Sequence, residues 1–202
     1  MSGWIRTRFM SPVLSQDEAS LSGCVVAARM TATALNVVQP LPSVVLITSM
    51  RPGEGKTTAA VRLANTLDDA VLIDADLRRP AAHKSLGERV GFGLSDVLRS
   101  RVTLEEAIRP TAGPALLTAG GLVDRADELL AERFADVLSG CRDWFSTIVI
   151  DSPPVGVVDD AIAIAPLADA VLGVVREGWT HRSDLRRLRE AATVSGVIWN
   201  VG

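Results

Sequence analysis

Hydrophobic residues along this chain gather into short continuous runs instead of alternating with polar residues. A continuous apolar run of strand length indicates a strand buried on both faces, as in a parallel sheet. The runs of this kind are 44–48, 71–73, 115–118, 147–150, 170–175 and 197–199. Between most of them, apolar residues recur at helical spacing, over 56–67, 125–140, 157–166 and 181–194. Strands that alternate with helices predict an α/β fold, a doubly wound and mostly parallel sheet flanked by helices.

The remaining segments are less regular. We expect residues 1–22 to form a mobile N-terminal arm, residues 23–42 a helix and a proline-containing linker, and residues 43–202 the main domain. Within that domain, segment 77–113 has only short helical patterns, at 94–99 and 104–108. The apolar stretches fall short of the roughly 20 residues that span a bilayer, and the first residues lack the apolar core of a secretory signal.

Composition narrows the class of protein. Hydrophobic residues make up 48% of the 202 residues and charged residues 22%, which excludes a disordered chain. The net charge of -3 argues against a nucleic-acid partner held by overall charge. The two cysteines, Cys24 and Cys141, lie far apart in sequence and form no metal-spaced pair.

A glycine-rich segment, TSMRPGEGKTT, follows the first apolar run of the main domain. Glycines let backbone N–H groups converge on an anion, a helix start adds its positive dipole end, and Lys56 adds a full charge, so the segment is typical of a phosphate-binding loop. The strict pattern G-x-x-x-x-G-K-[ST] fails at Met50, and the alternative is a tight strand-to-helix connection. The candidate ATP-binding residues are Arg51, Pro52, Gly53, Glu54, Gly55, Lys56, Thr57 and Thr58.

Three aspartates stand where apolar runs end. Asp74 and Asp76 follow one strand and leave it on the same side, and Asp151 follows another. Ligands bind at the carboxyl ends of strands in open α/β sheets. There, one carboxylate can hold Mg²⁺ while another accepts a proton during phosphoryl transfer. The alternative is a set of capping aspartates that accept hydrogen bonds from loop N–H groups.

With PGEGKTT, DADLRRP and IDSPP in this order, the chain resembles the bacterial tyrosine kinases of capsular and exopolysaccharide synthesis, in the same class of P-loop ATPases as MinD and ParA. The resemblance covers about residues 43–202. It implies that Lys56 and Thr57 bind the phosphates of ATP and Mg²⁺. It further implies that Asp76 and Asp151 organise the metal and that Asp74 is the candidate base.

The resemblance also implies partners and a location. It implies a membrane-embedded chain-length or export protein as activator, and a cytoplasmic position at the inner face of the membrane through that partner. A homo-oligomer is implied as well, but of the family's ring-forming motif the segment 26–32 keeps only Arg29. Arg51 stands where MinD-like ATPases carry a signature lysine that reaches across a dimer; alternatively, it is a solvated loop arginine.

Two further features leave alternatives open. The helix expected over 181–194 carries Arg182, Arg186, Arg187 and Arg189, which form either a solvated face or a surface for anionic lipid, a partner or DNA. His83 and His181 have no partner at metal-ligand spacing, so we expect both at the surface.

The chain contains no tyrosine, whereas the family it resembles phosphorylates its own tyrosine-rich tail. We therefore predict that this chain cannot autophosphorylate on tyrosine. It is either a kinase for tyrosines on another protein or a MinD/ParA-like ATPase switch without kinase activity, and a third alternative is a catalytically silent relative.

Overall fold

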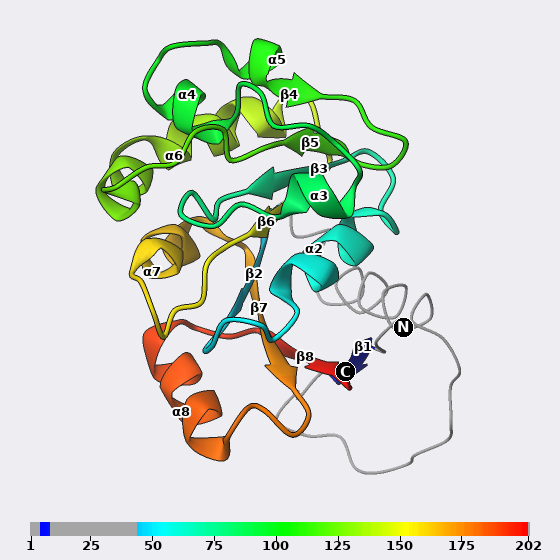
Figure 1. Ribbon diagram of the computed structural model, residues 1–202, viewed down its shortest axis with the longest axis vertical. Helices are drawn as coiled ribbons and strands as arrows, with labels where there is room; N and C mark the ends of the chain where they lie inside the picture. The colour runs from blue at the N-terminus through cyan, green and yellow to red at the C-terminus, as the bar shows by residue number, and fades with distance from the viewer. Residues whose placement is uncertain (1–4, 9–43, 202) are drawn as a thin grey trace.

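The computed structural model describes residues 5–8 and 44–201 (Figure 1). Residues 23–42, with the predicted helix and Arg29, lie outside this description. Within the expected irregular arm, the structure has a short strand, β1 (Ile5–Arg8), which pairs antiparallel with the last strand of the chain. None of the helices in the described segments is both long and apolar enough to cross a membrane.

The described residues form one sheet of eight strands in the order β1-β8-β7-β2-β6-β3-β5-β4. The six inner strands run parallel, and β1 and β4 pair antiparallel at the two edges. Their bounds are β2 (Val44–Ser49), β3 (Ala70–Asp74), β4 (Ile108–Arg109), β5 (Ala115–Leu117), β6 (Thr147–Asp151), β7 (Ala170–Arg176) and β8 (Gly196–Asn200). Every apolar run predicted to be a strand is one, and β2, β3 and β6 are buried at every residue.

Helices cover both faces of the sheet (Figure 1). Alternate residues of β2 show this, since Leu46 packs in one apolar cluster with α6 and Ile47 in the other with α2. The helices are α2 (Lys56–Ala64), α3 (Ala82–Ser85), α4 (Leu94–Leu98), α5 (Leu104–Ala107), α6 (Ala126–Arg142), α7 (Asp160–Ile164), the short 3₁₀ turn η1 (Ala165–Leu167) and α8 (Arg182–Ala191). The predicted doubly wound α/β fold is confirmed.

The strand order brings the three sequence motifs together. Strand β6 lies between β2 and β3, so the phosphate-loop strand and the two aspartate-bearing strands are direct neighbours. Ile47 pairs with Asp151, and Asp151 pairs with Asp74. Because these strands are parallel, their carboxyl ends meet at one edge of the sheet.

Candidate functional site at the carboxyl edge of the sheet

The phosphate loop leaves β2 and enters α2 through two glycines with left-handed backbone. Gly53 has φ 79° and Gly55 has φ 96°, a region that favours glycine because it has no Cβ. Gly55 is the N-cap of α2, so Lys56 is the first helical residue, and it is 8% exposed. Pro52 and Thr58 are exposed at the two ends of the loop.

Glu54 stabilises the shape of the phosphate loop. Its side chain is fully buried and accepts a hydrogen bond from the Arg51 backbone N–H at 2.7 Å and another from the Thr180 hydroxyl. The Asn200 side chain donates to the Glu54 carbonyl at 3.0 Å, and Arg176 donates to the Gly53 carbonyl at 3.1 Å. The loop is therefore held in shape by the ends of β7 and β8 and the turn before α8. Asn200 was not among the residues predicted from the sequence, although its position as a polar residue at a strand end was an available signal.

We expect Gly55→Ala to lower the affinity for ATP at least tenfold while the protein remains folded. An added Cβ would sit 2.4 Å from Asn200 Nδ2, the atom that bonds to the loop, and alanine costs about 1 kcal/mol at positive φ. Binding of a fluorescent ATP analogue measures the effect. Gly87→Ala is the matched control, since φ is 72° there but the added Cβ meets nothing within 4 Å. Equal ATP affinity in the two variants would contradict this account.

Asp74 is fully buried at the end of β3 and organises the following turn. Its Oδ2 accepts hydrogen bonds from the N–H groups of Ala81 and Ala82 at 3.0 and 2.9 Å, and its Oδ1 accepts one from Asp76 at 3.2 Å. Burial raises the pKa of Asp74 to about 6 despite these bonds. Asp76 is half-buried, and its Oδ1 accepts the Arg79 N–H at 2.9 Å.

Asp151 is 1% exposed, and its Oδ1 has no hydrogen-bond partner among the described residues. Burial, followed by repulsion from Asp74, raises the pKa of Asp151 to about 8, while a hydrogen bond from Thr57 and the charge of Lys56 oppose this shift. Burial lowers the pKa of Lys56, and attraction to Asp151 and Asp76 opposes that. The structure thus brings Lys56, Thr57, Asp74, Asp76 and Asp151 into one electrostatic unit.

The chemistry of these donors fits a nucleotide with Mg²⁺. A hydroxyl and a carboxylate with an unpartnered buried oxygen are hard oxygen ligands, which Mg²⁺ prefers. Within the described segments there is no group of three or more histidine, cysteine, aspartate or glutamate side chains that could hold a metal. Mg²⁺ typically uses only one or two carboxylates and completes its shell with phosphate oxygens and water, so this small donor set suits a metal that arrives with ATP.

The unfolding free energy of the nucleotide-free protein should fall as pH rises from 5 to 8. Asp151 has a folded pKa near 8 and an ordinary value of 3.8, so in this window the folded state keeps a proton that the unfolded chain releases. We expect this carboxyl to contribute a loss on the order of 2 kcal/mol, measured by urea unfolding. Asp151→Asn should remove that contribution. Parallel pH profiles for the wild type and the variant would disprove it.

Three arginines near the site have different surroundings. Arg51 forms a bidentate pair with Asp184 of α8, at 2.8 Å from Nε and 3.3 Å from NH2, and its side chain stays 42% exposed, so it is both paired and partly solvated. Arg78 binds buried Asp160 through Nε and NH2, both at 3.1 Å, and also contacts Asp127. Arg79 is exposed, with no side-chain bond to any described residue.

The two histidines also differ. His181 is exposed as expected, but His83 is buried, so the surface prediction for His83 is wrong. His83 is a residue of α3, the helix that follows the turn whose N–H groups bond to Asp74.

The amino-acid sequence of this chain is similar to those of known bacterial tyrosine-protein kinases. The chain is 32% identical over 155 residues to tyrosine-protein kinase YwqD of Bacillus subtilis, covering 73% of this chain and 65% of that protein. It is 32% identical over 163 residues to tyrosine-protein kinase CpsD of Streptococcus agalactiae, covering 76% and 70%. The chain thus spans about two thirds of the length of these relatives. No protein-family model matches it.

Solved structures agree with the sequence relatives. The kinase domain of VpsO superposes with a TM-score of 0.80 at 32% identity, covering 87% of this chain and 93% of that domain. The septum site-determining protein MinD from Pyrococcus horikoshii, solved with Mg-ADP, has a TM-score of 0.61 at 22% identity over 76% of this chain and 68% of that one. The second likeness concerns the fold alone.

Proposed function

The chain belongs to the family of bacterial tyrosine-protein kinases, and from that premise we propose that it transfers the γ-phosphate of ATP to tyrosine hydroxyls of another protein. The observation that carries this proposal is the gathering of Lys56 with Asp74, Asp76 and Asp151 at one sheet edge. A lysine at a helix start favours polyphosphate, and adjacent carboxylates supply a metal ligand and a proton acceptor.

In this mechanism the chain's own residues bind and orient the nucleotide. The N–H groups of the phosphate loop and Lys56 hold the β- and γ-phosphates, and the braces on Glu54 keep the loop shaped before ATP arrives. Mg²⁺ would be held by Thr57, Asp76 and Asp151. When bound, the ion would neutralise part of the negative charge of the phosphates. Removal of water from buried Lys56 strengthens its attraction to the phosphates.

The proton of the substrate passes to the Asp74–Asp76 pair. The tyrosine O–H bond breaks as its oxygen bonds to the γ-phosphorus, and the bond from that phosphorus to the β-phosphate oxygen breaks to release ADP. Asp74 is the candidate base, because a pKa near 6 matches proton acceptance near neutral pH. Asp74 is fully buried, whereas Asp76 is half-buried, so Asp76 is the member of the pair that meets the substrate.

The substrate tyrosines and the activator belong to other polypeptides. These 202 residues include no tyrosine, which supports a phosphate acceptor outside them. A membrane-embedded chain-length or export protein of capsular or exopolysaccharide synthesis suits both roles, and it would hold this chain at the inner face of the membrane.

The deciding experiment incubates the purified protein with γ-labelled ATP and the cytoplasmic tail of its neighbouring membrane protein. We expect label on tyrosines of the tail, loss of that label in Asp74→Asn and Asp76→Asn, and retention of ATP binding in both variants. ATP binding and hydrolysis without phosphotyrosine on the tail would refute the kinase proposal.

That second result would favour a nucleotide-driven switch. The observation in its favour is Arg51, which stands where the resemblance places the signature residue and pairs with Asp184 of its own chain at 2.8 Å. A switch predicts ATP-dependent dimerisation that Arg51→Ala weakens. Light scattering with and without ATP measures this dimerisation, and the switch requires it together with the absence of phosphotyrosine on the tail.

A further inference from the structure

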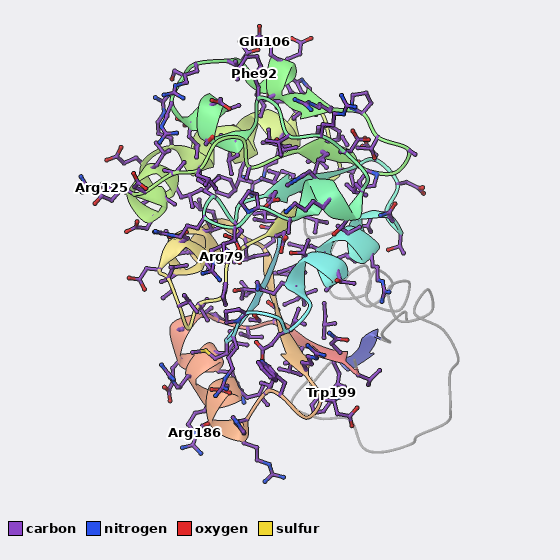
Figure 2. The ribbon with its side chains drawn as sticks, viewed as in Figure 1. Arg79, Phe92, Glu106, Arg125, Arg186 and Trp199 are labelled. Carbon is purple, nitrogen blue, oxygen red and sulfur yellow. The ribbon has the colours of Figure 1, made fainter. Side chains whose placement is uncertain are left out.

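Helix α8 carries a stripe of arginines on its outer side. Arg182, Arg186 and Arg189 are spaced four and three residues apart, which places them along one side of a helix, and all three are exposed. None of them forms an ion pair or side-chain hydrogen bond with a described residue. Figure 2 shows Arg186 on the outer side of α8, pointing away from the sheet. These three residues are called the arginine stripe below.

The opposite side of α8 is fixed to the body of the protein. Leu188 is 1% exposed and packs with Met50 and Val155, and Asp184 is 3% exposed. Asp184 also accepts the His181 N–H at 3.0 Å, which caps the start of the helix. This side of α8 is therefore held against the body of the protein, and the stripe is presented in a preorganised arrangement that lowers the entropic cost of binding.

The guanidinium groups of the arginine stripe favour a ligand that carries carboxylates. Guanidinium groups bind carboxylates through two parallel hydrogen bonds. At about 1.5 Å per helical residue, Arg182 and Arg186 are roughly 6 Å apart along the axis. Alternate residues of an extended peptide are separated by about 6.6 Å, so carboxylates at every second position match this spacing.

A membrane or nucleic acid fits less well. The exposed side of α8 has no large apolar residue that could enter a bilayer, since Leu185 is half-buried and Leu188 is buried. The net charge of -3 opposes approach to an extended anionic surface, whereas a short acidic segment contacts only the stripe.

We propose that the arginine stripe of α8 is a docking surface for an extended acidic segment of a partner protein, and that docking changes the phosphate loop. The connection is the Arg51–Asp184 pair, which joins α8 directly to the first residues of the loop. A shift of α8 on docking therefore moves Arg51. Arg51 is also bonded to Glu54 in the phosphate loop, because the Glu54 side chain accepts the Arg51 backbone N–H. The coupling rests on the proposed nucleotide site, whereas docking itself does not.

The docking test uses a fluorescent peptide in which glutamate alternates with serine, and fluorescence anisotropy reports its binding. The triple variant Arg182→Ala, Arg186→Ala, Arg189→Ala should weaken binding at least tenfold. The matched control is Arg99→Ala, Arg133→Ala, Arg142→Ala, which removes the same charge from exposed arginines directly after α4 and on α6 and should change the affinity less than twofold. A peptide with glutamine in place of glutamate should not bind.

The coupling test measures affinity for an ATP analogue with and without saturating peptide. We expect saturating peptide to change the affinity for the ATP analogue at least threefold, and the analogue to change the affinity for the peptide by the same factor. The Arg51→Gln variant should still bind the peptide but should lose this mutual effect. No peptide binding, equal losses in the two triple variants, or binding to phosphatidylglycerol vesicles in place of the peptide would overturn the docking surface. Unchanged nucleotide affinity would overturn the coupling. None of these outcomes depends on phosphoryl transfer, so the kinase proposal is tested separately.

Discussion

Replacing Lys56 with methionine is expected to lower the rate of phosphoryl transfer at least 100-fold and to weaken ATP binding. Lys56 is the one buried cation beside three carboxylates in the described site, at the start of α2 where the phosphates would lie. Removing a preorganised group that stabilises developing charge typically costs about 3 kcal/mol. Methionine keeps the length and apolar stem of lysine, so it can occupy the same buried position.

The chain offers a close control for this substitution. Lys56 and Lys84 are its two lysines, and Lys84 is exposed on α3. Lys84→Met should leave transfer within twofold of the wild type, measured with the same labelled ATP and acceptor. Thermal unfolding should show that both variants are folded. If Lys56→Met retained more than a tenth of the activity, the phosphates would have to bind elsewhere.

The sequence predicted the parts of the fold and the site that depend on local pattern. Continuous apolar runs identified the parallel strands, and the residues directly after them identified the carboxyl edge of the sheet. Asp74 and Asp151 are neighbours because β3 and β6 are adjacent, and this strand order was not predicted from the sequence. Edge strand β4, with two residues, carries too little pattern to be predicted.

The sequence could not predict the contacts that hold the site, because they join residues far apart in the chain. Glu54 in the phosphate loop bonds to Thr180, 126 positions away, and Arg51 pairs with Asp184, 133 positions away. No local periodicity marks either pair. Glu54 was predicted from the sequence only as a candidate ATP-binding residue of the loop, and nothing in the sequence indicated that its side chain is fully buried and shapes the loop.

The two adjacent arginines of the DADLRRP segment also make contacts that could not be predicted from the sequence. Both follow Asp76 and look equivalent in sequence, yet their side chains have opposite roles. Arg78 joins the turn after β3 to Asp160 at the start of α7 and to the Asp124 carbonyl at 3.2 Å. It therefore fixes the turn that carries Asp74 and Asp76 against the segment that follows Asp151. Arg79 has no such contact with the described residues.

Arg78→Ala should accordingly reduce the free energy of unfolding by about 3 kcal/mol. The Asp160 side chain has no exposed surface, so the substitution leaves a buried carboxylate without its partner. Arg79→Ala, one position along, should change stability by less than about 0.5 kcal/mol. Urea unfolding of the two variants at neutral pH measures the difference directly.

A double substitution separates the loss of charge pairing from the loss of packing. Adding Asp160→Asn to Arg78→Ala removes the unpaired buried charge, so the double variant should recover at least 1 kcal/mol relative to Arg78→Ala alone, roughly the worth of desolvating an unpaired polar group. Arg78 is a third exposed at its side chain, so packing contributes the smaller share. Equal stability of the Arg78→Ala and Arg79→Ala variants would mean that the Arg78–Asp160 pair does not hold the turn, and the position of Asp76 at the site would then need another cause.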